Sequence, residues 1–224
     1  KSLPKVSAMC PRWMNSGKFV FHIFSIGTRW TPPPKKKCHP KTKENYQTDL
    51  VTIVWIGSLS TGKYLQIIAQ VLRELTKKYS IKLKVIGVDV IIDGVDCELV
   101  DWKENTEVSE LLSADIGIMP LDNTIWEKGK CGFKLIQYMA CGLPVVASDA
   151  PANEEIIENG VNGYIAHNEK EWYQCLENLI ISTSLREFFG KSGRIKIESN
   201  YSYQAWGDKY CSYLNSINKW KFFL

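Results

Sequence analysis

Two segments of the chain carry the residue types that bind phosphate groups. The first reads Gly57-Ser-Leu-Ser-Thr-Gly62-Lys63 and follows a run of apolar, largely β-branched residues. The second, residues 129–134, contains two glycines and two lysines. Glycine lets the backbone approach a ligand closely, and the free N–H groups of a helix N-terminus, together with a lysine, favour an anion. The two segments predict a site for a phosphate or diphosphate group.

The second segment predicts a helix that opens near Gly132 and points its free N–H groups toward the first segment. Lys130 and Lys134 add positive charge there, and Gln137 lies further along the predicted helix surface, where it could bind sugar hydroxyls. Two helix N-termini and three lysines facing one crevice suit a diphosphate without a metal ion. The competing interpretation is a pair of exposed lysines on an ordinary loop.

The first segment also satisfies the pattern G-x-x-x-x-G-K of a phosphate-binding loop. Such a loop needs Ser or Thr at the next position to hold Mg²⁺, and Tyr64 stands there. Asp93 and Asp122 are weak candidates for the second carboxylate of such a site. A phosphate-loop NTPase or kinase is therefore an alternative function, and a non-catalytic nucleotide-binding or interaction module is another.

Seven scattered cysteines form no C-x-x-C pair, and no histidine lies at ligand spacing from them. We expect reduced thiols, no metal site and no bound cofactor. No apolar run approaches the 18 residues of a membrane span, and the first ten residues lack the apolar core of a signal peptide. These features predict a cytoplasmic protein.

Residues 1–45 contain ten Lys and Arg residues against a single Glu. A basic arm of this kind could contact nucleic acid or anionic lipid. Residues 30–49, rich in Pro and Lys, lack the interleaved aromatics of a single-strand binder. We interpret residues 1–49 as a basic arm and linker with one short strand at 19–24, and expect no nucleic-acid partner.

From residue 51 onward, strand and helix patterns alternate, which predicts parallel pairing through right-handed crossovers. The expected fold is an α/β, Rossmann-like doubly wound parallel sheet occupying residues 50–224. Strand patterns lie at 51–58, 81–88, 97–102, 115–121, 143–149 and 161–168, and helix patterns near 62–79, 105–113, 132–141, 153–159, 169–181, 184–198 and 202–218. Ligands of such sheets bind beyond the carboxyl ends of the strands. Trp102, at the end of the third strand, either lines a base pocket or is a partly buried core aromatic.

The stretch GKCGFKLIQYMACGLPVVAS, followed by NEEIIENGVNGYIA, resembles the donor-binding signature of the group 1 (family 4) glycosyltransferases. WIGSLSTGKYL is similar to the opening strand and turn of the same C-terminal domain, and the likeness extends over residues 51–215. The resemblance implies a GT-B fold, in which two Rossmann-like domains face each other and the C-terminal one holds the nucleotide sugar. The resemblance also implies an enzyme of the hexosyltransferase type, which transfers a sugar from a nucleotide diphosphate sugar. The transfer is expected to retain the anomeric configuration and to need no metal ion.

The chain departs from the family pattern at several positions. Lys63 matches the family's lysine, whereas Ser58 stands where the family commonly has Arg. The family's two glutamates, eight residues apart, fall on Gly129 and Gln137, and Gln137 is expected to orient the ribose. The residues that we expect to bind the donor are Gly57, Ser58, Lys63, Gly129, Lys130, Gly132, Phe133, Lys134 and Gln137.

Only about 45 residues precede the part that resembles the family, so we expect the N-terminal acceptor domain to be largely missing. None of His22, His39 and His167 can be nominated as a catalytic base, and the catalytic residues stay unknown. The partners implied by the resemblance are a nucleotide sugar donor and a sugar or lipid-linked acceptor of unknown identity. It also implies glycan assembly at the inner face of a membrane, with peripheral membrane contact.

Overall fold

The computed structural model describes residues 50–122, 124–125, 129–202, 204–207 and 211–212. The predicted basic arm, its short strand and much of the last predicted helix lie outside the described residues. The division of the chain between residues 49 and 50 therefore stays a prediction.

Six parallel strands form one sheet in the order β3-β2-β1-β4-β5-β6. Their bounds are β1 Val51–Ile56, β2 Ile81–Ile86, β3 Cys97–Val100, β4 Ile116–Met119, β5 Val145–Ser148 and β6 Gly163–Ala166. The central strands β1, β4 and β5 are almost wholly buried, as expected for parallel strands covered on both faces. The predicted doubly wound Rossmann-like sheet is confirmed.

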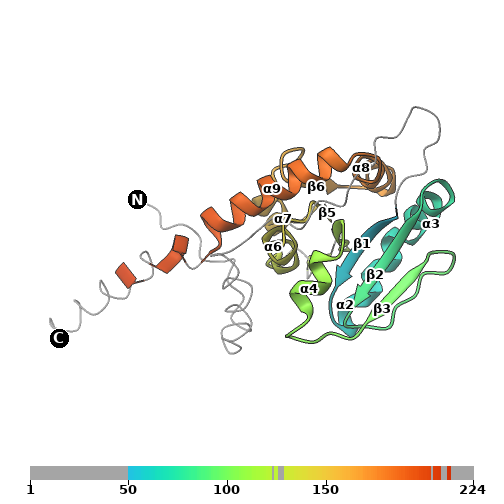
Figure 1. The fold of residues 1–224 in the computed structure, drawn as a ribbon, viewed down its shortest axis with the longest axis horizontal. Coiled ribbons are helices and arrows are strands. Elements are labelled where there is room, and N and C mark those ends of the chain that lie inside the picture. The colour runs from blue at the N-terminus through green and yellow to red at the C-terminus, as the bar shows by residue number, and fades with distance from the viewer. Residues whose placement is uncertain (1–49, 123, 126–128, 203, 208–210, 213–224) are drawn as a thin grey trace.

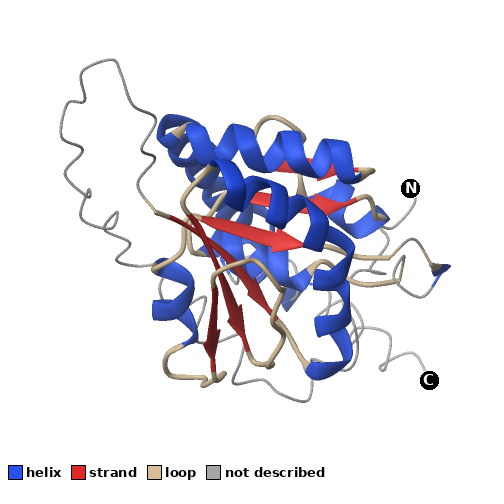
Figure 2. Ribbon diagram, turned by 90° about the vertical axis from the view of Figure 1, so that its right-hand side faces the viewer, coloured by secondary structure: helices blue, strands red, loops and turns tan. Residues whose placement is uncertain are grey.

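Helices cover both faces of this sheet (Figure 2). The helical segments are α2 Leu59–Gly62, the 3₁₀ helix η4 Lys63–Ile68, α3 Ala69–Lys78, α4 Glu107–Leu112, α6 Phe133–Ala140, α7 Pro151–Ile156, α8 Glu169–Ile181 and α9 Thr183–Asn200. Helices α3 and α8 share one apolar core with the sheet, whereas α4, α6 and α7 share the core on the opposite face.

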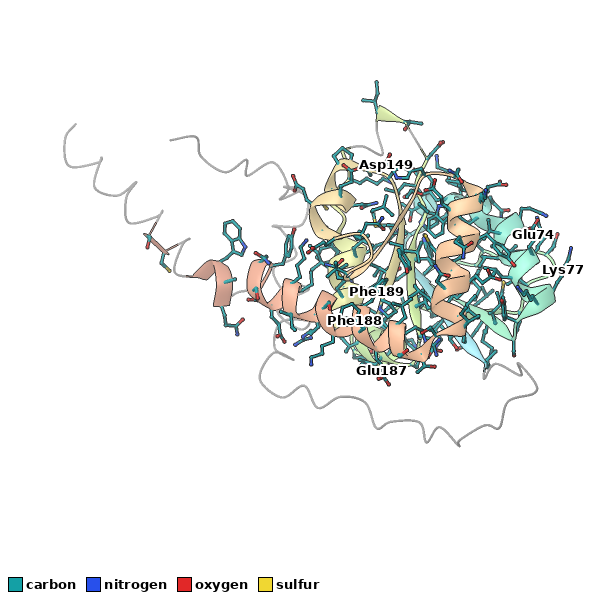
Figure 3. All side chains as sticks on the ribbon, turned by 90° about the horizontal axis from the view of Figure 1, so that it is seen from above. Glu74, Lys77, Asp149, Glu187, Phe188 and Phe189 are labelled. Atoms are coloured by element: carbon teal, nitrogen blue, oxygen red, sulfur yellow. The ribbon has the colours of Figure 1, made fainter. Side chains whose placement is uncertain are left out.

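The long helix α9 runs along the domain beside β6, where the two cores meet (Figure 1). Two neighbouring phenylalanines of α9 lie differently (Figure 3). Phe189 is buried against the ring of Tyr164, with ring centroids 4.9 Å apart, whereas Phe188 is exposed. Within the described parts of the chain, no helix is both long and apolar enough to cross a bilayer.

The helix that follows β1 begins earlier than the sequence pattern predicts. It starts at Leu59 rather than near residue 62, and its second turn is a 3₁₀ helix. The reason is local, because the backbone N–H of Ser58 donates to the Thr61 hydroxyl and the Thr61 N–H donates to the Ser58 carbonyl. These bonds close a helical turn where the sequence suggested an open glycine-rich loop.

Candidate anion-binding site

The strand order reverses between β1 and β4, and this switch point is where doubly wound sheets bind ligands. β1 and β4 pair through only two residue pairs, so they separate toward their carboxyl ends. The Tyr138 hydroxyl of α6 fills this opening: it accepts from the N–H of Ile56 and donates to the carbonyl of Ile118, at 3.0 and 3.3 Å. The tyrosine thereby joins the two strands near their carboxyl ends.

The Trp55 indole brings the two predicted segments together at this edge of the sheet. A Cβ atom on Gly57 would lie 2.4 Å from the indole Cη2, so only glycine lets the chain pass over this ring. The Lys134 ammonium lies 4.4 Å from the centroid of the same ring, within cation–π range. Trp55 packs in the core on the α3 side of the sheet, whereas Lys134 comes from α6 on the opposite side. Their contact therefore joins the two sides at the carboxyl edge of the sheet.

The Tyr64 ring makes a second junction between the same two segments. The ammonium groups of Lys63 and Lys130 lie 5.2 and 4.2 Å from its centroid. Lys130 also lies close enough to Lys134 for their charges to repel. We call Lys63, Lys130 and Lys134 the lysine cluster; the structure places all three around the Trp55 and Tyr64 rings, on one side of the molecule.

Lys134 has a strongly lowered pKa. Burial, together with the charge of Lys130, lowers the pKa of Lys134 to about 7. An ammonium group held away from water and beside a like charge is destabilised, and a bound anion would reverse both effects. The described surroundings of Lys134 therefore favour an anionic ligand.

Helix α6 begins beside the lysine cluster, and Gly132 is the residue that precedes it. Gly132 has φ of +65°, and a Cβ there would lie 2.5 Å from the Ile156 side chain of α7. The first hydrogen bond of the helix joins the Leu135 N–H to the Gly132 carbonyl, so the amides of Phe133 and Lys134 come before the intrahelical ladder. These amides and the lysines are donors in one region. Gly129 and Ser58 are exposed, and the Ser58 hydroxyl lies 3.0 Å from that of Ser60.

Gln137 does not lie on the helix surface, so that prediction is wrong. Only 4% of Gln137 is exposed, and its amide nitrogen donates to the Glu107 carboxylate at 2.7 Å. The other carboxylate oxygen accepts from the Trp102 indole N–H at 2.6 Å. Sequence reasoning missed Glu107; its one local signal was an acidic residue in the first turn of a helix near the carboxyl edge.

His167, which the sequence did not nominate as a base, and the predicted phosphate-binding loop also lie on this edge. The His167 Nδ1 lies 3.1 Å from the Asp149 carboxylate after β5, and both side chains are half exposed. The Thr61 and Gly62 amides bond to the Ser58 carbonyl within the helical turn. A phosphate-binding loop would leave such amides free, so the geometry disfavours the NTPase alternative.

The described residues contain no group of three or more His, Cys, Asp or Glu side chains arranged to hold a metal ion. Five of the seven cysteines lie in the described parts, and each is a free thiol there.

Comparisons with known proteins agree with this architecture. CapM, a capsular polysaccharide biosynthesis glycosyltransferase of Staphylococcus aureus, is 26% identical over 191 residues, which cover 80% of this chain and 50% of CapM. Spore coat protein SA of Bacillus subtilis is 42% identical over 69 residues, covering 30% of this chain and 18% of that protein. The chain thus spans half or less of the curated relatives that it matches.

Solved structures show the same fold. S. aureus TarM, in complex with UDP, fondaparinux and α-GlcNAc-glycerol, aligns with a TM-score of 0.60 at 20% identity, covering 79% of this chain and 37% of TarM. Anabaena HepE in complex with UDP-glucose aligns with a TM-score of 0.60 at 15% identity, over 75% of this chain and 49% of HepE. The C-terminal domain of Francisella tularensis LpcC, a group 1 family glycosyltransferase, aligns with a TM-score of 0.51 at 21% identity. The alignment covers 68% of this chain and 86% of that domain.

The sequence profile described as "Glycosyl transferases group 1" matches residues 51–182, which is more than half of the chain. The matched range contains the whole lysine cluster, Trp55 and Tyr64, and it ends at the junction of α8 and α9. The chain belongs to the group 1 glycosyltransferases.

Proposed function

We propose that the lysine cluster binds the diphosphate of a nucleotide diphosphate sugar, and that this domain is the donor-binding half of a glycosyltransferase. One observation carries the proposal: three lysines from two separate segments surround Trp55 and Tyr64 at the carboxyl edge of β1. A diphosphate linked to a nucleoside and a sugar is an anion whose negative charge complements these ammonium groups.

The lysines would act most strongly as the glycosidic bond breaks. Negative charge then accumulates on the leaving diphosphate, and ammonium groups already held in place stabilise it without reorganisation. Lys134 gains most, because an anion relieves the cost of its buried charge. Charge supplied by side chains takes the role of a divalent cation, and we therefore propose a metal-independent reaction.

Two similar structures support the choice of ligand. TarM was solved with UDP and HepE with UDP-glucose. The finer features of the proposal are a hexosyl donor, retention of configuration and a sugar or lipid-linked acceptor bound by a second domain. The chain spans half or less of its curated relatives, and we propose that a second domain carries the acceptor site. Glycan assembly in the cytoplasm, with peripheral contact to the inner face of a membrane, completes the proposal.

Calorimetric titration with UDP, GDP and ATP, each with Mg²⁺ and with EDTA, tests this function. We expect a nucleoside diphosphate to bind equally well in EDTA. Lys134→Ala should weaken that binding by about 1.5–3 kcal/mol, the contribution of a charged hydrogen bond. Lys191→Ala, which removes an exposed lysine of α9, is the matched control and should change nothing.

Each contrary result selects another function. Binding of Mg-ATP alone would favour the NTPase or kinase. Absence of binding to all three nucleotides would leave a non-catalytic interaction module.

A further inference from the structure

A carboxylate is buried at the start of α4 without an ion-pair partner among the described residues. Glu107, in the first turn of α4, is 3% exposed, and its two oxygens accept from Trp102 and Gln137. Burial raises the pKa of Glu107, although the two hydrogen bonds oppose this effect. An apolar residue of similar size would avoid the free-energy cost of burying a carboxylate. We therefore attribute the role of Glu107 to the two side chains that it hydrogen-bonds, Trp102 and Gln137.

Glu107 bridges two parts of the domain, which we call its first and second flanks. On the first flank, Gly87 lies between Trp102 and Gly57. A Cβ atom added to Gly87 would lie 3.3 Å from the Trp102 Cβ and 2.5 Å from the Gly57 carbonyl oxygen. Trp102, Gly87 and Gly57 therefore follow one another along the carboxyl ends of β3, β2 and β1. On the second flank, Gln137 lies one helical turn after Lys134 on α6.

The two hydrogen bonds fix what each group can offer to a ligand. Trp102 is 43% exposed although its N–H is bound, so Glu107 holds an aromatic surface in one orientation next to solvent. A planar base can stack on such a surface. Because the Gln137 amide nitrogen donates to Glu107, its amide oxygen is the group left to accept a hydroxyl proton.

We propose that Glu107 is a positioning residue for the nucleoside of the donor. It orients Trp102 to stack on the base and Gln137 to accept from a ribose hydroxyl, and it does not itself touch the ligand. This inference rests on the proposed function, since the nucleoside is located by a diphosphate bound at the lysine cluster. The sequence pattern assigned no role to Glu107 because its two partners lie five and thirty residues away on different elements.

Comparing ligands with and without a nucleoside tests the proposal. The probes are UDP, GDP and inorganic pyrophosphate, with calorimetry for the nucleotides and NMR titration for weak pyrophosphate binding. We expect Glu107→Ala to weaken the better nucleotide at least ten-fold and to change pyrophosphate binding less than two-fold. Trp102→Ala should give the same selective loss. Lys134→Ala should weaken nucleotide and pyrophosphate alike.

Circular dichroism and thermal melting establish that each variant is folded. If Glu107→Ala does not fold, Glu107→Gln, which keeps the shape and one acceptor oxygen, and Trp102→Ala decide the question by the same ratio. Equal weakening of nucleotide and pyrophosphate by the Glu107 and Trp102 variants would overturn the inference, as would no weakening of either. If the wild-type chain binds neither UDP nor GDP, the proposed function fails, and the inference fails with it.

Discussion

We expect Lys134 to make binding of a nucleotide sugar depend on pH. Its pKa in the free protein is about 7, because the ammonium is buried beside Lys130, and a bound diphosphate will raise that pKa. The protonated fraction of free Lys134 falls from about 0.9 at pH 6 to about 0.1 at pH 8. If only the protonated form binds the anion well, affinity falls about ten-fold over this range, which corresponds to about 1.4 kcal/mol.

Calorimetric titration at pH 6, 7 and 8 measures this change, and a nucleotide sugar is the proper ligand. Its two bridged phosphates are fully ionised across the range, whereas the terminal phosphate of UDP titrates near neutrality. UDP-glucose and GDP-glucose serve as probes in buffers of different ionisation enthalpy, which also reveal the proton taken up on binding.

Two variants separate Lys134 from other groups that titrate. Lys134→Arg keeps a charge at every pH in the range, so its affinity should change less than two-fold between pH 6 and 8. Lys134→Met should bind more weakly and without the pH dependence. An affinity of the wild-type protein that stays constant from pH 6 to 8, or one that rises with pH, would refute the reasoning.

Three further predictions concern the elements that hold the site, each measured by urea denaturation. Tyr138→Phe removes the hydroxyl between β1 and β4 and should cost about 1–3 kcal/mol, because a buried N–H loses its acceptor; a cost below about 0.5 kcal/mol would contradict this role. Gly132→Ala adds a methyl group at φ of +65° against the Ile156 side chain and should lower the free energy of unfolding. The control is Gly160→Ala, where φ is +80° and no atom lies within 4 Å, and it should lose about 1–2 kcal/mol, less than Gly132→Ala. Equal losses would argue against close packing at Gly132. Lys134→Met should stabilise the ligand-free protein by about 1 kcal/mol or more at pH 6, where the native state must carry the charged ammonium. The effect should be smaller at pH 9, because native Lys134 is then largely neutral and folding releases its proton. A destabilised variant would show that the ammonium does not destabilise the native state.

The centre of the sheet could be predicted from the sequence because β1, β4 and β5 are short and largely apolar. The run from Val51 to Ile56 is an example, since a strand covered on both faces needs no polar residue. The place of the lysines also followed from the sequence, because carboxyl ends of parallel strands share one edge. Lys63 and Lys134 do lie on the same side, as that geometry requires.

The sequence could not predict contacts that depend on side chains far apart in the chain. Gln137 was expected on the surface because the helical pattern alone does not reveal Glu107 thirty residues earlier. The helix start at Leu59 was missed because hydrogen bonds between Ser58 and Thr61 outweigh the loop preference of the neighbouring glycines. The contacts of Trp55 with both predicted phosphate-binding segments likewise appear only once the strands are assembled.

A crystal structure with bound UDP tests most directly whether the lysine cluster is a diphosphate site. We expect the two phosphates at the carboxyl edge of β1, with oxygens about 2.7–3.2 Å from the ammonium groups of at least two of Lys63, Lys130 and Lys134. A diphosphate bound elsewhere on the domain, with no phosphate oxygen near these three ammonium groups, would contradict the account.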